Sequence, residues 1–127
     1  MVSAMGAAEF DLHITQGSRY RLPMTLRSKP TESQPNPGPL DLTGFTARSQ
    51  IRPNHGRDTA VLHEMTTENG SIVIDGTAGK ITLTIPGAVS SLWLWLQGVY
   101  DFELVDPDGE PERLLQGAAY VDPEVTR

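Results

Sequence analysis

The amino-acid sequence predicts an all-β antiparallel sandwich of seven or eight short strands, formed as one domain by residues 1–127. Apolar and polar residues alternate with a period of two along most of the chain, which is typical of strands with one buried face. Clusters of Gly, Pro, Asn and Asp interrupt these runs at short intervals. No long segment keeps a helical period, and 127 residues is an ordinary length for one domain.

The first two alternating runs predict a β-hairpin over residues 9–27, with a turn at residues 16–18. Pro23 lies inside the second run, and because proline has no N–H to donate, this strand is expected at a sheet edge or a bulge. Across the whole chain, the residues expected to be buried are Phe10, Leu12, Ile14, Ile51, Ile81, Leu83, Tyr100, Phe102 and Leu104.

Residues 28–40 contain four prolines among Ser, Thr, Asn and Gly, so they predict a loop that neither packs nor pairs. Such long loops are usually disordered or functional. We expect this one to be open to proteases in the isolated protein and to become ordered against a neighbouring molecule. Pro35 and Pro37 are therefore candidate interface residues.

Six further strands and a helical turn follow the loop. The turn is expected at residues 86–92, with Pro86 near its first position. The expected strands are Phe45 to Ile51, Val61 to Met65, a hairpin of residues 72–74 and 81–85, Tyr100 to Leu104, and a last strand from about Glu112 to Val121.

The composition excludes several classes of function. The chain has no cysteine, which rules out disulfides, thiolate catalysis and cysteine-ligated metals. A net charge of −6 argues against non-specific nucleic-acid binding. Residues 1–60 carry seven Lys/Arg against five Asp/Glu, whereas residues 61–127 carry three against eleven. This asymmetry is either ordinary solvated surface or a pair of complementary patches that orient neighbouring subunits.

The search for chemistry finds no catalytic, cofactor-binding or metal site, so we do not expect an enzyme. The three histidines are far apart and have no partners at metal-ligand spacing. Asp106-Pro107-Asp108-Gly109 partly resembles a calcium loop but is a strong turn signal in its own right. Asp101 and Glu103 share one strand face, which predicts a solvated face more than a carboxylate pair.

The run Leu92-Trp93-Leu94-Trp95-Leu96 fits neither a surface strand nor a surface helix, since both of its faces are apolar. One interpretation is that both faces are buried where a helical turn enters the sandwich. The other is a binding hot spot, because tryptophan is enriched at interface centres. Trp93 and Trp95 are accordingly candidate contacts to another chain.

Three blocks of sequence carry a resemblance to a known family. They are DLTGFTARSQIR at residues 41–52, NGSI at 69–72 with GKITLTIP at 79–86, and GVYDFEL at 98–104 with RLLQG at 113–117 and VTR at 125–127. In this order and spacing they resemble small virion proteins of tailed bacteriophages, similar to the N-terminal domain of the upper baseplate protein that carries receptor-binding proteins. The match runs from about residue 10 to the end of the chain.

The resemblance implies an immunoglobulin-like sandwich that links tail, collar or baseplate to fibres. Its partners would be other virion proteins and copies of itself, with no nucleic acid, membrane or cofactor, and its location would be the virion after synthesis in the host cytoplasm. No coiled coil or receptor-binding domain follows Arg127 in this sequence, which favours a standalone adaptor or, alternatively, a capsid-decorating protein. A cellular module that binds carbohydrate or another ligand is the alternative from a different class.

Overall fold

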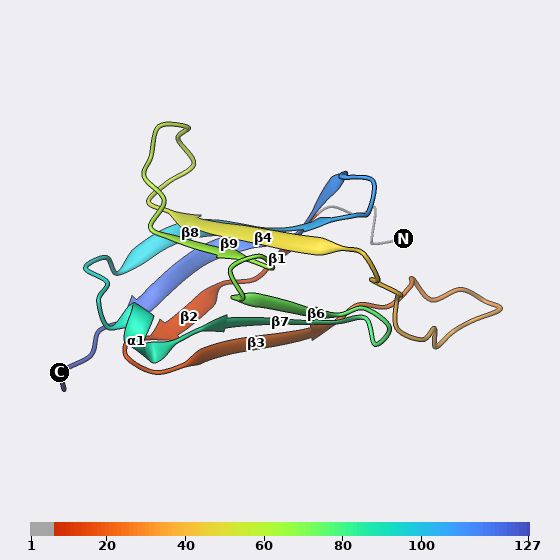
Figure 1. Ribbon diagram of the computed structural model, residues 1–127, viewed down its shortest axis with the longest axis horizontal. Coiled ribbons are helices and arrows are strands. Elements are labelled where there is room, and N and C mark those ends of the chain that lie inside the picture. Colours follow the sequence, from red (N-terminus) through yellow and green to blue (C-terminus); the bar gives the residue numbers. More distant parts are fainter. Residues whose placement is uncertain (1–6) are drawn as a thin grey trace.

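The computed structural model describes residues 7–127, which form two facing β-sheets (Figure 1). Within this range the elements are β1 (Ala8–Glu9), β2 (Leu12–Thr15), β3 (Tyr20–Thr25), β4 (Thr46–Arg52), β5 (His63–Thr66), β6 (Ile72–Asp75), β7 (Lys80–Ile85), α1 (Gly87–Ser90), β8 (Gln97–Val105) and β9 (Pro111–Asp122). The predicted β-sandwich is thereby confirmed.

The larger sheet has the strand order β1-β9-β8-β4-β5, and β2 also pairs with β9. The smaller sheet has the order β3-β7-β6. The pairings β9–β8–β4–β5 and β3–β7–β6 are antiparallel, but β1 and β2 both run parallel to β9. The large sheet is therefore mixed, and its first two strands depart from the antiparallel pairing that the sequence predicts.

The predicted hairpin over residues 9–27 does not form. The expected turn exists, with Ser18 N–H donating to the Thr15 carbonyl at 3.1 Å and Gly17 at a φ of 83°. It carries the chain from one sheet to the other, so β2 pairs with β9 and β3 pairs with β7. The sequence located the turn correctly but not the partners, because the central strand β9 lies about a hundred residues away along the chain.

The core lies between the two sheets and is built from the inward phase of the alternating strands. Of the nine residues expected to be buried, eight are: Leu12, Ile14, Ile51, Ile81, Leu83, Tyr100, Phe102 and Leu104. They are joined in the core by Leu42, Ala47, Met65, Ile72, Ile85, Ala119 and Val121. The alternation therefore gave the correct inward phase in strands of both sheets.

Phe10 is the exception, because its side chain is 43% exposed. The alternating run that it opens is broken in the structure, since β1 ends at Glu9 and β2 begins at Leu12. Phe10 lies in this break, where its N–H donates to the Gln116 carbonyl at 2.9 Å. An unbroken strand would have placed its side chain inside with those of Leu12 and Ile14.

The strand that contains Pro23 lies at a sheet edge, as the sequence predicted. Pro23 lies in β3, which is an outer strand of the small sheet and pairs only with β7, where Pro23 is opposite Thr82. The hairpin β6–β7, the helical turn and the last strand also form where the sequence predicted them. The short strand expected from Val61 to Met65 forms slightly later, as β5.

The proline-rich segment forms an extended loop that projects from the end of the sandwich opposite α1 (Figure 1). Its base is fixed, since Leu40 N–H donates to the Leu26 carbonyl at 2.8 Å and the Arg27 side chain donates to the Pro37 carbonyl at 3.3 Å. Pro37 is buried in this base, whereas Pro35 is exposed at the outer part of the loop. Among residues 7–127, no helix is long and apolar enough to cross a membrane.

Candidate functional site

The segment between α1 and β8, residues 91–96, forms an irregular loop that we call the leucine loop. Its backbone is anchored at both ends. Trp93 N–H donates to the Ser90 carbonyl at 3.0 Å, and the Leu96 carbonyl accepts from Val121 N–H at 2.9 Å. In its middle, the Gln16 side-chain amide donates to the Trp93 carbonyl at 3.0 Å. The leucine loop is thus tied to the β2–β3 turn and to β9.

The two tryptophans form the inner side of the leucine loop. Their rings stack with centroids 4.6 Å apart, and Trp93 also lies against the His63 ring at 5.2 Å. Both indoles are half-buried and pack against the core. The two indoles therefore pack between the leucine loop and the core.

The three leucines form its outer side. Leu92 is 79% exposed, Leu94 is 99% exposed and Leu96 is 54% exposed. Single exposed apolar residues are common on soluble proteins, but three within five residues give this segment an apolar outer side, and exposed apolar surface of this kind marks interaction sites. Because the loop backbone is anchored, this apolar side is held outward by the structure.

The candidate residues from the sequence occupy different surroundings. The stacked rings of Trp93 and Trp95 pack against the core. The exposed apolar side chains of the same segment are those of the leucines. Pro35 and Pro37 lie in the proline-rich loop at the far end of the sandwich (Figure 1). The structure therefore does not bring the two pairs of candidates together, and a role of either pair in binding stays a prediction.

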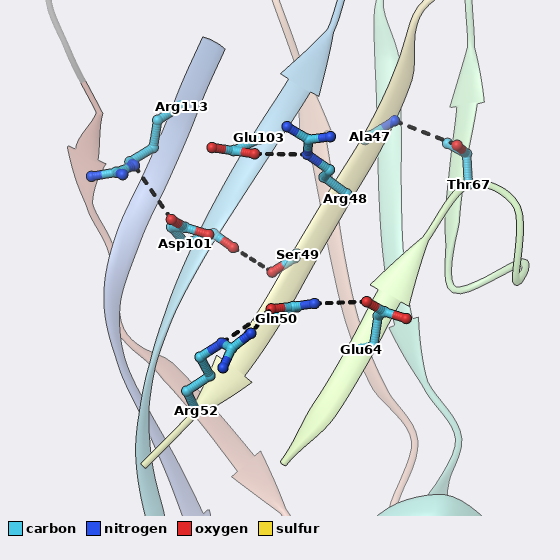
Figure 2. A network of polar contacts seen from close by, with 10 residues as sticks. All are labelled: Ala47, Arg48, Ser49, Gln50, Arg52, Glu64, Thr67, Asp101, Glu103 and Arg113. Atoms are coloured by element: carbon cyan, nitrogen blue, oxygen red, sulfur yellow. Dashed lines mark hydrogen bonds and ion pairs between the residues drawn. The ribbon is translucent and has the colours of Figure 1, made fainter. Parts of the chain in front are cut away.

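The outer face of the large sheet carries a second surface, which is polar (Figure 2). Arg48 on β4 pairs with Glu103 on β8 at 2.8 Å, and Arg113 on β9 pairs with Asp101 on β8 at 3.4 Å. The prediction that Asp101 and Glu103 belong to a solvated face is confirmed, since 40% and 26% of their side-chain surfaces remain exposed there.

Farther along this face, the Gln50 side chain on β4 forms hydrogen bonds with Glu64 on β5 and with Arg52 at the end of β4. Its amide donates to Glu64 Oε2 at 2.7 Å, and its carbonyl oxygen accepts from Arg52 Nε at 3.1 Å and Nη2 at 2.9 Å (Figure 2). Arg52 also donates to the Thr59 carbonyl in the β4–β5 loop. The Arg52 guanidinium is thus held in place by neutral oxygens.

A hollow of about 430 Å³ opens on this face where the β4–β5 loop rises beside β8 and β9. We call it the arginine hollow, because Arg52, Arg57 and Arg113 line it together with His55, Asp101 and Gln116. A β-bulge follows Arg113, one of its lining residues. The β8–β9 register shifts after Phe102, so that Glu103 is opposite Arg113 and Leu114 is the additional residue.

Burial or hydrogen bonding shifts the pKa of a few groups. Desolvation lowers the pKa of His63 beside Trp93. Desolvation, followed by the charges of Tyr20, Asp11 and Glu9, raises the pKa of Tyr100. Thr43 donates to the exposed carboxylate of Asp41 from its hydroxyl and its N–H, and these bonds lower the pKa of Asp41.

The sequence 106–109 forms the expected turn. Asp106 Oδ1 accepts from the N–H groups of Asp108 and Glu110, each at 2.9 Å, and Gly109 has a φ of 87°. Within the described range 7–127, no group of three or more His, Asp or Glu side chains is placed to hold a metal ion.

Fold and surfaces together define a two-sheet β-sandwich that presents an anchored apolar loop and a polar sheet face. No protein-family model and no curated protein matches this chain.

Two parts of these surfaces were missed from the sequence. The leucines were considered only as one face of a possible strand, and nothing in the local pattern says which side of an irregular loop faces the core. The arginine hollow joins residues of β4, β8 and β9, and only the sheet pairing brings them together. The excess of Lys and Arg over Asp and Glu in residues 1–60 was the one signal in the sequence that pointed to this hollow.

Proposed function

We propose that this protein is a structural component of a tailed-bacteriophage virion, an adaptor at the tail or baseplate that links tail or collar to fibres through protein–protein contacts. The resemblance of the three sequence blocks supports this proposal. The strand order β2-β9-β8-β4-β5 facing β3-β7-β6 is also compatible with the immunoglobulin-like arrangement that the resemblance implies.

The leucine loop is the observation that carries the proposal of a protein-binding role. Burying an exposed leucine side chain contributes roughly 1.5–3 kcal/mol, and the loop carries three exposed leucines at alternate positions. Because the stacked tryptophans and the backbone hydrogen bonds already fix the loop, binding costs little of the ordering entropy that a flexible loop would lose. A preformed apolar contact of this kind suits a subunit that occupies a fixed place in an assembly.

The test is incorporation into particles. The double variant Leu92→Ser/Leu94→Ser should fold normally, because both side chains are exposed, but its amount on purified particles should fall by at least about tenfold. Val73→Ser and Val125→Ser provide matched controls, since these valines are 61% and 90% exposed at other places on the surface. Both controls should be incorporated as well as the unmodified protein.

Electron microscopy of the same particles locates the protein. Density for the protein at the tail or baseplate agrees with the adaptor role. Density on the capsid shell would instead show that the protein decorates the capsid. If the protein is absent from particles, or if flanking genes lack phage morphogenesis functions, the proposal of a virion protein is wrong. A glycan array then tests the ligand-binding alternative.

A further inference from the structure

The arginine hollow is a positively charged site on a protein with a net charge of −6. Three arginines and one aspartate line it, a formal balance of +2. The single carboxylate, Asp101, is already paired with Arg113. Arg52 is held by Gln50 and Thr59, which carry no charge. Within the lining, only the charge of Arg113 is therefore neutralised, and those of Arg52 and Arg57 remain.

Arg57 is an accessible residue of the hollow. It lies in the exposed part of the β4–β5 loop, and within residues 7–127 its side chain is in neither of the two ion pairs. Arg113 is also accessible, with half of its side-chain surface exposed. An arginine fork of this kind binds a carboxylate with two parallel hydrogen bonds. The hollow thus suits an acidic side chain.

The same chain carries a matching acidic element. The turn between β8 and β9 contains Asp106, Asp108 and Glu110, and no lysine or arginine occurs between Lys80 and Arg113. The Asp106 carboxylate is engaged by the turn itself, which fixes the backbone. Asp108 and Glu110 are exposed at the tip. The turn therefore presents two exposed carboxylates on a backbone that hydrogen bonds hold in place.

The turn of one molecule is far from the Arg57 end of the arginine hollow of the same molecule. This end lies near Val99 on β8, whereas the turn begins after Val105, about 20 Å farther along the strand at roughly 3.3 Å per residue. Only Arg113, opposite Glu103, is nearer to the turn. Figure 1 shows the β4–β5 loop and the β8–β9 turn at opposite ends of the large sheet. Two complementary sites at opposite ends define a head-to-tail contact between copies.

We propose that the acidic β8–β9 turn of one copy binds in the arginine hollow of the next copy. This inference deepens the proposed function, since it assigns the contact by which repeated subunits are oriented in an assembly. The contact uses exposed charges, which gain little in dilute solution. It is therefore weak between free molecules and becomes effective where an assembly holds neighbours at about millimolar effective concentration.

The test is self-association of the purified protein at about millimolar concentration, measured by sedimentation equilibrium. At roughly 0.01 M salt, where the screening length is about 30 Å, the protein should form dimers and short oligomers. At roughly 1 M salt, where the screening length is about 3 Å, it should be monomeric. Arg57→Glu and Asp108→Lys should each reduce association at least tenfold at low salt.

Mixing the two variants gives the decisive result. Arg57→Glu retains the acidic turn and Asp108→Lys retains the hollow, so an equimolar mixture should form heterodimers although each variant alone does not. Arg19→Glu and Glu32→Lys are matched controls, because both residues are exposed elsewhere and should leave association unchanged. Thermal unfolding shows that all four variants are folded.

A protein that stays monomeric at low salt overturns the inference. Loss of association in Arg57→Glu but not in Asp108→Lys also overturns it, because another acidic segment then fills the hollow. Neither result bears on the presence of the protein in particles. A protein that is incorporated into virions but fails this test leaves the proposed function standing without this contact.

Discussion

The phenolic hydroxyl of Tyr100 donates a hydrogen bond to the backbone carbonyl of Phe10, ninety residues earlier in the chain. Tyr100 is on β8, and Phe10 lies in the break between β1 and β2, so the bond reaches across β9. The residue of β9 opposite Tyr100 is Gly117, where an added Cβ would lie 2.6 Å from the Phe10 carbonyl oxygen. A glycine at this position allows the N-terminal strands to approach closely.

Tyr100→Phe should reduce the free energy of unfolding by about 1–1.5 kcal/mol, the net contribution of one hydrogen bond together with a carbonyl left without this donor. Denaturant unfolding followed by tryptophan fluorescence measures the change. Tyr120→Phe is the matched control, because Tyr120 lies on the exposed side of β9. Equal stability of both variants would show that the bond contributes nothing.

Stability should fall at alkaline pH because of Tyr100. Burial raises the pKa of its hydroxyl above the ordinary value of 10.0, so the folded state favours the neutral form. This contribution is complete below pH 10 and is lost as the pH rises above that value. Tyr20, whose pKa burial also raises, acts in the same direction. The decline above pH 10 should be shallower in Tyr100→Phe than in the unmodified protein, as measured by unfolding at a series of pH values.

The two sides of the leucine loop should respond differently to truncation. Trp93→Ala and Trp95→Ala should each lower the free energy of unfolding by about 2–3 kcal/mol, less than for a fully buried tryptophan because the indoles are half-buried. Leu94→Ser should change it by less than about 0.5 kcal/mol, since the side chain is 99% exposed. Tryptophan variants as stable as the unmodified protein would instead mean that the indoles contribute little to the core.

His63 should make the protein less stable in mild acid. Burial lowers its pKa below 6.5, so the folded state favours neutral imidazole, and its Nε2 atom is buried without a hydrogen-bond partner in the described part of the chain. The stability that this provides is present above pH 6.5 and is lost as the pH falls below it.

Melting temperatures at about pH 7.5 and pH 5.5 check this. The difference between them should be smaller in His63→Gln than in the unmodified protein. His55→Gln, at an exposed loop position, should keep the full difference. The same difference in all three proteins would assign the pH dependence to carboxylates alone.

The proline-rich loop should be the first segment cut by a broad-specificity protease. Residues 29–36 are exposed, and the bonds that hold the loop lie at its base, between Leu26, Arg27 and residues 37–40. Mass spectrometry of early fragments should place the first cuts within residues 28–36. A first cut in the β4–β5 loop, which Asn54, Gly56 and Thr59 cross-link by hydrogen bonds, would mean that the proline-rich loop is the better protected of the two.

The sequence by itself determined where most strands form and which of their faces turns inward, with the break at Phe10 as the exception. Alternation in β2, β4, β7 and β8 was sufficient, because a period of two places every second side chain on one face of a strand whatever its partner. It also located the turns, the edge strand with Pro23 and the irregular proline-rich loop. These features depend on local backbone geometry, which neighbouring residues set.

Only the tertiary structure decided the pairing of the strands and the direction of the leucine loop. β2 pairs in parallel with β9 because the core brings distant strands together, and local pattern carries no information about that choice. Tyr100 faces the core, and continuing the alternation of β8 toward the N-terminus would place Leu92, Leu94 and Leu96 on the same inward face. The strand begins only at Gln97, and the phase does not continue past its end. The stacked tryptophans therefore face the core and the leucines face outward.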